Sequence, residues 1–175
     1  FGGQTAIKLT HALENAGVSI SQCESIGLGS PGTCDSEAGV VVRAYNLGWF
    51  NVPVCQMLTN RFGIPARLSN DANCAALAET VAGAAVGCKN MVLITLGTGV
   101  GGGIIHTGKI CHGSNGMGGE VGHMAVRMNG EPCPCGNVGC WEQYASATAL
   151  KRQTKAAWEQ HPHSILAKVI GEQGR

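Results

Sequence analysis

Apolar residues follow two patterns along the chain: spacings of three and four in some stretches and short continuous runs in others. The first pattern predicts helices that bury one face, and the second predicts buried strands. Strands that alternate with helices favour a mostly parallel α/β fold. Helices are expected over 5–16, 53–62, 72–85, 141–159 and 165–170, and strands over 24–29, 39–44, 64–69, 90–96, 103–105 and 109–111.

Two of these helices have defined starts. The helix near Ala72 follows Asn70 and Asp71 at the end of a strand, and either residue could cap it; Gly87 would close it. The other helix starts at about Pro53 and ends at Gly63, and its expected core stripe is Val54, Met57, Leu58 and Phe62.

Composition restricts the class of protein. Hydrophobic residues make up 44% of the 175 residues and charged residues 13%, so the chain can bury a substantial core. The net charge is +1 without a Lys/Arg cluster, so neither a nucleic acid nor a membrane surface is the expected partner. Nine cysteines, no signal-like N-terminus and no long apolar run indicate a reducing, cytoplasmic compartment.

One histidine and three cysteines lie close together in the sequence. His123, Cys133, Cys135 and Cys140 supply an imidazole and three thiolates, which suit a tetrahedral, structural zinc ion. The cysteines could instead pair as disulfides or serve as small buried hydrophobes. Because tight cysteine clusters in a reducing compartment more often bind metal, the spacing favours zinc.

Two acids bracket this cluster. Glu120 precedes His123 by three residues, and Glu142 follows Cys140 by two. A loop clamped by a metal ion would hold both carboxylates in fixed positions, as supporting groups do around a site.

Asp71 has two interpretations. It could only cap the helix that begins near Ala72. It could also be functional, because a carboxylate at the C-terminal end of a strand faces the crevice where α/β proteins bind ligands. Position alone favours the structural role.

The glycine-rich stretch 97–103 follows a strand, as a phosphate-binding loop would, and Thr98 adds a hydroxyl. It matches neither the P-loop nor the dinucleotide pattern, and it could simply be a sharp corner. The segment 30–32 and Asn46 also follow strands and could contact a ligand, although either could be an ordinary turn.

These motifs together resemble the ROK family of sugar kinases and related repressors. In order they are Asn-Asp ending a strand, Leu-Gly-Thr-Gly-x-Gly-Gly-Gly, Glu-x-Gly-His and Cys-x-Cys-Gly-x-x-Gly-Cys-x-Glu, and the match covers about residues 25–150. Ser-Pro-Gly and Asn-Leu-Gly-Trp look most like bacterial glucokinases. The resemblance implies the actin-like (ribonuclease H-like), two-lobed α/β ATPase fold, with sugar and ATP bound between the lobes.

The resemblance assigns a sugar site. Asp71 matches the family's catalytic base and Asn70 a sugar-hydroxyl contact, while Glu120 and Glu142 match acids that accept hydrogen bonds from the sugar. His123 matches a residue that binds zinc through one ring nitrogen and can face the sugar with the other. Further sugar contacts in the first lobe match Gly32 and Asn46.

The resemblance also assigns a metal and a nucleotide. The remaining zinc ligands match Cys133, Cys135 and Cys140, and the turn that approaches the ATP phosphates matches Gly97, Thr98 and Gly99. Structural Zn²⁺, ATP and Mg²⁺ are therefore the expected cofactors, glucose is the leading hexose, and ROK proteins are usually homo-oligomers.

The match to the family is partial. The opening Asp-x-Gly-Gly-Thr phosphate motif and the later segment of the adenine pocket have no counterpart, so we expect an internal piece of a kinase, inactive by itself. Residues 1–89 would be part of the small lobe, with the sugar loops and Asp71. Residues 90–175 would start the large lobe, with the phosphate and zinc loops. A sugar-sensing ROK repressor and a zinc-stabilised scaffold without activity are the alternatives.

Overall fold

The computed structural model of the chain describes residues 2–172 and, within them, the side chains of residues 7–45 and 47–169. Within this part of the chain, no helix has the length and apolar character needed to cross a membrane. The helices are α1 (Gly2–Ala16), α2 (Val54–Phe62), α3 (Asp71–Ala82), α4 (Glu142–Ala145), α5 (Ala147–Gln160) and α6 (Ile165–Glu172), with 3-10 turns η1 (Ile20–Gln22), η2 (Tyr45–Leu47) and η3 (Val121–His123). The strands are β1 (Ile26–Ser30), β2 (Thr33–Asp35), β3 (Val40–Ala44), β4 (Trp49–Val52), β5 (Ala66–Asn70), β6 (Met91–Leu96), β7 (Val100–His106) and β8 (Lys109–Ile110).

The chain forms two compact units. The first unit comprises the chain up to Leu93 together with Gly103–Gly119. The second unit comprises Ile94–Gly102 and the chain from Glu120 onward. The assignment of residues 1–89 and 90–175 to the two lobes of the family stays a prediction.

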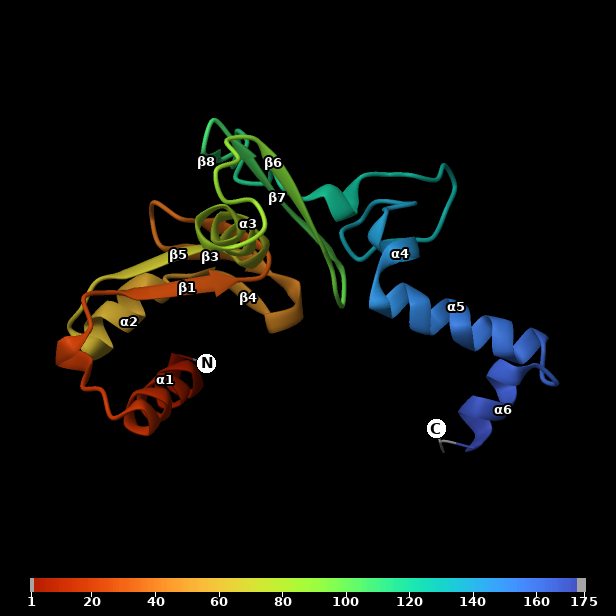
Figure 1. Ribbon diagram of the computed structural model, residues 1–175, viewed down its shortest axis with the longest axis horizontal. Helices are drawn as coiled ribbons and strands as arrows, with labels where there is room; N and C mark the ends of the chain where they lie inside the picture. The colour runs from red at the N-terminus through yellow and green to blue at the C-terminus, as the bar shows by residue number, and fades with distance from the viewer. Residues whose placement is uncertain (1, 173–175) are drawn as a thin grey trace. The chain divides into compact units, whose positions relative to one another are not determined.

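The first unit is built around a parallel strand pair. β1 and β5 run in register from Ile26 beside Ala66 to Ser30 beside Asn70, so both strands end at the same edge. Helix α3 packs against both strands on one side, and α2 contacts β5 on the other (Figure 1). The core beneath them gathers the buried residues of α2, β3 and β5, namely Val41, Ala44, Val54, Cys55, Leu58 and Leu68.

The expected parallel sheet is only partly present. The pairs β2–β3, β3–β4 and β7–β8 are antiparallel, and β6 joins β7 in the same sheet as β8. The sequence analysis missed β2 and β4, which are three and four residues long. Short edge strands of this kind contain too few alternating positions for the pattern to distinguish them from loops.

Several predicted boundaries also shift. Strand β7 starts at Val100, inside the glycine-rich stretch, and α3 ends at Ala82, where the backbone N–H of Gly83 caps it. The helix expected over 141–159 is divided at Ser146, which ends α4 and caps α5 through a hydrogen bond from the Ala149 N–H. A serine that accepts a backbone hydrogen bond competes with continuation of the helix and favours a new start.

The buried face of α2 contains other residues than those expected. Val54 and Leu58 are buried as predicted, but Met57 is 41% exposed and Cys55 is buried instead. The Cys55 N–H donates to the carbonyl of Gly39, and Gly39 has no side chain to separate the two segments. This close approach to the start of β3 turns Cys55 inward.

Candidate functional site

At the carboxyl edge of the β1–β5 pair, the loop after β1 is held in place by two neighbours. Gly32 has φ +83°, and a β-carbon there would collide with the carbonyl oxygen of Arg43 and lie 2.9 Å from the Cα of Ala44. The same glycine accepts a hydrogen bond through its carbonyl from the Asn70 side-chain amide, at 3.1 Å. The loop therefore needs glycine both for its conformation and for its contact with β3.

Asn70 and Asp71 lie at the start of α3. Asn70 is the N-cap, and its Oδ1 accepts from the N–H groups of Ala72 and Asn73 at 2.9 and 3.1 Å. Asp71 is exposed, and its carboxylate accepts only from the adjacent Ala72 N–H, at 2.9 Å, among the recorded hydrogen bonds of the described chain. Because Asn70 caps the helix, Asp71 is left with a carboxylate that can act on a ligand.

The structure thus brings three of the predicted sugar contacts of the first unit to one edge: Gly32, Asn70 and Asp71. Asn46 lies in η2, directly after β3, and its side chain lies outside what the structure describes.

The second unit carries the metal loop, which we define as residues 120–142. Its backbone has little regular structure: η3 and two isolated bridges, Ala125 with Cys140 and Pro132 with Val138. The hydroxyl of Tyr144 accepts from the Glu131 N–H at 2.7 Å and so ties the loop to α4.

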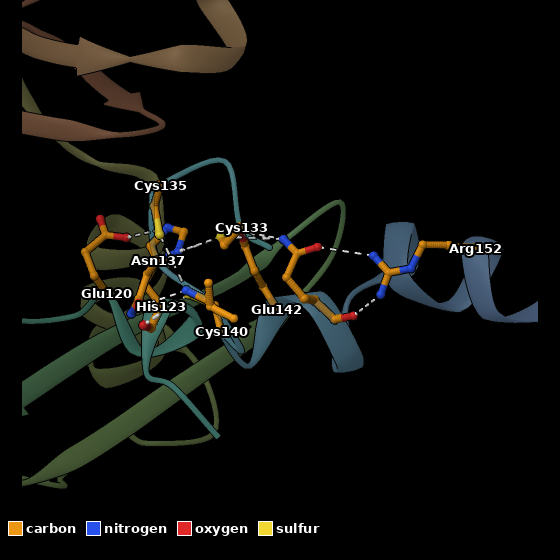
Figure 2. A network of polar contacts seen from close by, with 10 residues as sticks. Glu120, His123, Cys133, Cys135, Asn137, Cys140, Glu142 and Arg152 are labelled. Carbon is orange, nitrogen blue, oxygen red and sulfur yellow. Dashed lines mark hydrogen bonds and ion pairs between the residues drawn. The ribbon is translucent and has the colours of Figure 1, made fainter. Parts of the chain in front are cut away.

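The four candidate ligands come together in this loop (Figure 2). One ligand atom from each of His123, Cys133, Cys135 and Cys140 lies within 4.8 Å of all the others. The Sγ atoms of Cys135 and Cys140 are 3.7 Å apart, and Sγ of Cys133 is 3.6 Å from Nδ1 of His123. A tetrahedral zinc ion with sulfur at about 2.3 Å and nitrogen at about 2.0 Å gives edges of about 3.8 and 3.5 Å. The donor set and these two distances fit zinc.

The three thiols differ in acidity. Burial raises the pKa of Cys133 to about 12, and burial also raises the pKa of Cys140. Burial acts on Cys135 in the same direction, but hydrogen bonds from the Asn137 backbone and from the other two thiols outweigh it and lower the pKa of Cys135. Cys135 is also the exposed member of the cluster, so its thiolate forms first.

Both flanking acids lie against His123, one at each ring nitrogen. Nε2 of His123 is 3.8 Å from Oε2 of Glu120, and Nδ1 is 3.7 Å from Oε1 of Glu142. Oε1 of Glu142 also accepts from the Cys133 thiol at 3.3 Å. The metal loop therefore holds two carboxylates beside one imidazole, as its sequence predicts.

The candidate phosphate turn, residues 97–99, follows β6. Its three carbonyl oxygens all accept hydrogen bonds: Gly97 from the Ala147 N–H at 2.8 Å, Thr98 from the Thr148 hydroxyl at 2.7 Å, and Gly99 from the Gly97 N–H at 3.0 Å. Among the recorded hydrogen bonds of the described chain, the N–H groups of Thr98 and Gly99 have none. The N–H groups of Thr98 and Gly99 are therefore available to donate, while the three carbonyl oxygens already accept hydrogen bonds from the protein. This arrangement suits the binding of an anion.

Sequence reasoning missed the residues that support these groups. Gln143 donates to Sγ of Cys133 and to Oε1 of Glu142, both at 3.5 Å, and the guanidinium of Arg152 holds Gln143 through its side chain and backbone at 3.2 and 2.6 Å (Figure 2). Nine positions separate Gln143 from Arg152 and fifty separate Thr98 from Thr148, so no local spacing could indicate either contact.

Comparison with known proteins gives consistent results. The ROK family profile matches residues 5–173. A glucokinase of Halalkalibacterium halodurans is 47% identical over 150 residues, which are 85% of this chain and 46% of the relative. The chain spans about half the length of the curated glucokinases that it matches.

Two solved structures share the fold. A ROK family transcriptional regulator, a homologue of the E. coli MLC protein, aligns with a TM-score of 0.82 at 30% identity over 96% of this chain and 42% of the regulator. A ROK family glucokinase from Streptomyces griseus, in complex with glucose and AMPPNP, aligns with a TM-score of 0.79 at 39% identity over 90% of this chain and 50% of the kinase. The predicted actin-like α/β fold, present in part, is confirmed, and the chain belongs to the ROK family.

Proposed function

We propose that the protein containing this chain is an ATP-dependent hexose kinase that transfers a phosphoryl group to the 6-hydroxyl of glucose. The observation that carries the proposal is the phosphate turn, whose carbonyls are all bonded back while two amides remain free to donate. A kinase needs such a turn for its nucleotide, whereas a sugar sensor does not. The similarity to glucokinases, one of them crystallised with glucose and AMPPNP, supports the same assignment.

Asp71 is the proposed general base. Its carboxylate is exposed, and Asn70 rather than Asp71 is the N-cap of α3, so Asp71 bonds only to the Ala72 N–H among the described residues. It would orient the sugar hydroxyl and accept its proton late in the reaction, because the transition state of phosphoryl transfer is loose and requires little activation of the nucleophile. ATP would enter as its Mg²⁺ complex, which neutralises charge on the phosphates.

Glu120, His123 and Glu142 are the proposed hydroxyl-binding residues of the metal loop. Those proposed for the first unit are Gly32, Asn46 and Asn70. Each carboxylate can accept two hydrogen bonds from vicinal hydroxyls, so an analogue that lacks a hydroxyl leaves a desolvated acceptor without a partner. This difference would give the site its selectivity among hexoses.

Zinc is the proposed metal, held by His123, Cys133, Cys135 and Cys140. With four protein ligands it would have a structural role, which is to fix the loop that carries both acids. Nδ1 of His123 faces Cys133 and is the proposed ligand atom, while Nε2 faces Glu120 and would remain available to the sugar site.

The deciding experiment is a coupled assay of the full-length protein with ATP and a panel of hexoses. We expect glucose to be phosphorylated and Asp71→Asn to lower kcat about 10³-fold, since a positioned general base contributes roughly 10²- to 10⁴-fold. Bound glucose should still stabilise this variant against heat. A full-length protein that binds the sugar but transfers no phosphate would contradict the kinase assignment.

A sugar-sensing ROK repressor is the second candidate, supported by the similarity to the transcriptional regulator. It would use the metal loop and the hydroxyl-binding residues without phosphoryl transfer, so it predicts glucose binding that is insensitive to ATP. Sugar-dependent thermal stabilisation that Glu120→Ala abolishes would exclude a scaffold without a ligand, and the kinase assay above separates the two remaining candidates.

A further inference from the structure

The start of α5 lies directly against the phosphate turn. The backbone N–H of Ala147 donates to the carbonyl of Gly97 at 2.8 Å, and the hydroxyl of Thr148 donates to the carbonyl of Thr98 at 2.7 Å. Both donors are in the first helical turn, whose backbone is fixed by the Ser146 cap, and Ser146 is 4% exposed. A rigid helix end therefore holds two consecutive carbonyls of a glycine-rich turn.

Glu142 limits the space beside Gly99. A β-carbon at this position would lie 2.7 Å from Oε2 of Glu142. The other oxygen of that carboxylate accepts a hydrogen bond from the side-chain amide of Gln143 at 3.5 Å, which restrains Glu142. Residues 142–148 thus bond to two residues of the turn and leave no room for a side chain at the third.

The orientation of the peptide groups decides whether the phosphate turn can bind an anion. If the peptide between Thr98 and Gly99 rotated by about 180°, Thr98 O would face the ligand in place of the Gly99 N–H, and a carbonyl oxygen would repel a phosphate. The Thr148 hydroxyl makes the one hydrogen bond to Thr98 O recorded within the described residues. Without this hydroxyl the peptide group between Thr98 and Gly99 could rotate, because Gly99 accepts many backbone conformations.

We propose that Thr148 is a positioning residue for the nucleotide: its hydroxyl holds the carbonyl of Thr98 away from the phosphates, so that the N–H of Gly99, which lies in the same peptide group, points toward them. The inference rests on the proposed kinase function and concerns its ATP site. Thr148 acts through Thr98 and makes no contact with substrate.

Thr148→Val tests the inference in the full-length protein, because valine keeps the shape of threonine and removes only the hydroxyl. We expect the KM for ATP to rise about fivefold, which corresponds to one neutral hydrogen bond of about 1 kcal/mol. The KM for glucose should stay within twofold, and Thr148→Ser should restore the KM for ATP. Thr154→Val is the matched control, since it lies on the same helix about 9 Å farther along.

Hydrogen exchange gives a readout independent of activity. Thr148→Val should speed exchange of the Gly99 amide in the presence of AMPPNP and leave β1 and β5 unchanged. An unchanged KM for ATP, or a rise that serine does not reverse, would overturn the role of Thr148 while ATP-dependent turnover of the unsubstituted protein upholds the kinase. A full-length protein that shows no ATP-dependent turnover would contradict both proposals.

Discussion

The edge of the β1–β5 pair and the metal loop carry comparable polar groups on very different supports. Asn70 and Asp71 end a strand and start a helix, above a core that contains Leu58 and Leu68 at 4% exposure each. The metal loop has no such core: its buried hydrophobic residues are Cys133 and Cys140, while Met124 and Met128 are 54% and 90% exposed. One region is supported by apolar packing, and the other depends on its polar cluster.

This difference predicts which substitutions would unfold each region. Apolar burial is spread over many contacts, so deleting one side chain weakens the first unit without abolishing it. A four-ligand cluster concentrates the stabilisation in a few bonds, and the apparent free energy of structural zinc sites is about 10 kcal/mol or more. The two regions should therefore fail separately and for different reasons.

Loss of the proposed zinc ion should give the largest effect. We expect Cys140→Ser, or exhaustive chelation, to abolish stoichiometric zinc and to speed amide exchange across residues 120–142 at least about 100-fold, because the loop has almost no other buried support. Exchange across β1 and β5 should change less than about twofold. Elemental analysis and hydrogen exchange measure both. Cys88→Ser is the control, since Cys88 is exposed and lies outside the cluster. A metal loop that stays protected after chelation would contradict this separation.

A cavity in the core of the first unit should destabilise that unit and leave the metal loop intact. Leu68→Ala should lower its free energy of unfolding by about 3 kcal/mol, the usual cost of truncating a buried leucine, and leave the zinc content unchanged. Denaturant unfolding followed by exchange at β1 and β5 measures the change. Leu77→Ala, at a leucine that is 42% exposed on α3 of the same unit, should cost less than about 1 kcal/mol. Equal costs at the two leucines would show that the first unit does not depend on its core.

The smallest effect is expected to distinguish two glycines that both have positive φ. Gly32 and Gly48 both have positive φ, but a β-carbon at Gly48 meets nothing within 4 Å, whereas one at Gly32 collides with β3. Gly48→Ala should therefore cost about 1 kcal/mol for its conformation alone, and Gly32→Ala about 2 kcal/mol more. Thermal unfolding with and without glucose measures both, and only Gly32→Ala should weaken the shift that glucose causes. Indistinguishable variants would exclude the contact with β3 as the reason for glycine.

The features predicted from the sequence are those that depend on the spacing of residues close together in the chain. The intervals between His123 and the three cysteines, and the Asn70-Asp71 pair before an alanine-rich helix, were sufficient to indicate the two polar regions before any coordinates. The break at Ser146 could also have been anticipated, because serine is a strong N-cap residue. The short strands β2 and β4 were not predicted, because whether they form depends on pairing with neighbouring strands and not on their own sequence.

Contacts between distant segments could not be predicted at all. The approach of Glu142 to Gly99 and of Thr148 to Thr98 depends on how the end of α4 and the start of α5 pack against the turn after β6. The inward turn of Cys55 likewise depends on Gly39, which is sixteen positions earlier in the chain. Hydrophobic periodicity indicates that a face is buried and does not indicate which segment covers it.

The side-chain amide of Asn70 uses both of its ends: Oδ1 accepts from two N–H groups of α3, and Nδ2 donates to Gly32. Aspartate and serine can replace the acceptor but cannot offer the same NH₂ group, and glutamine is one methylene too long for the cap. Attempts to engineer a new sugar preference should therefore leave position 70 unchanged and vary its neighbours, because any replacement there would disturb the helix start and the loop at once.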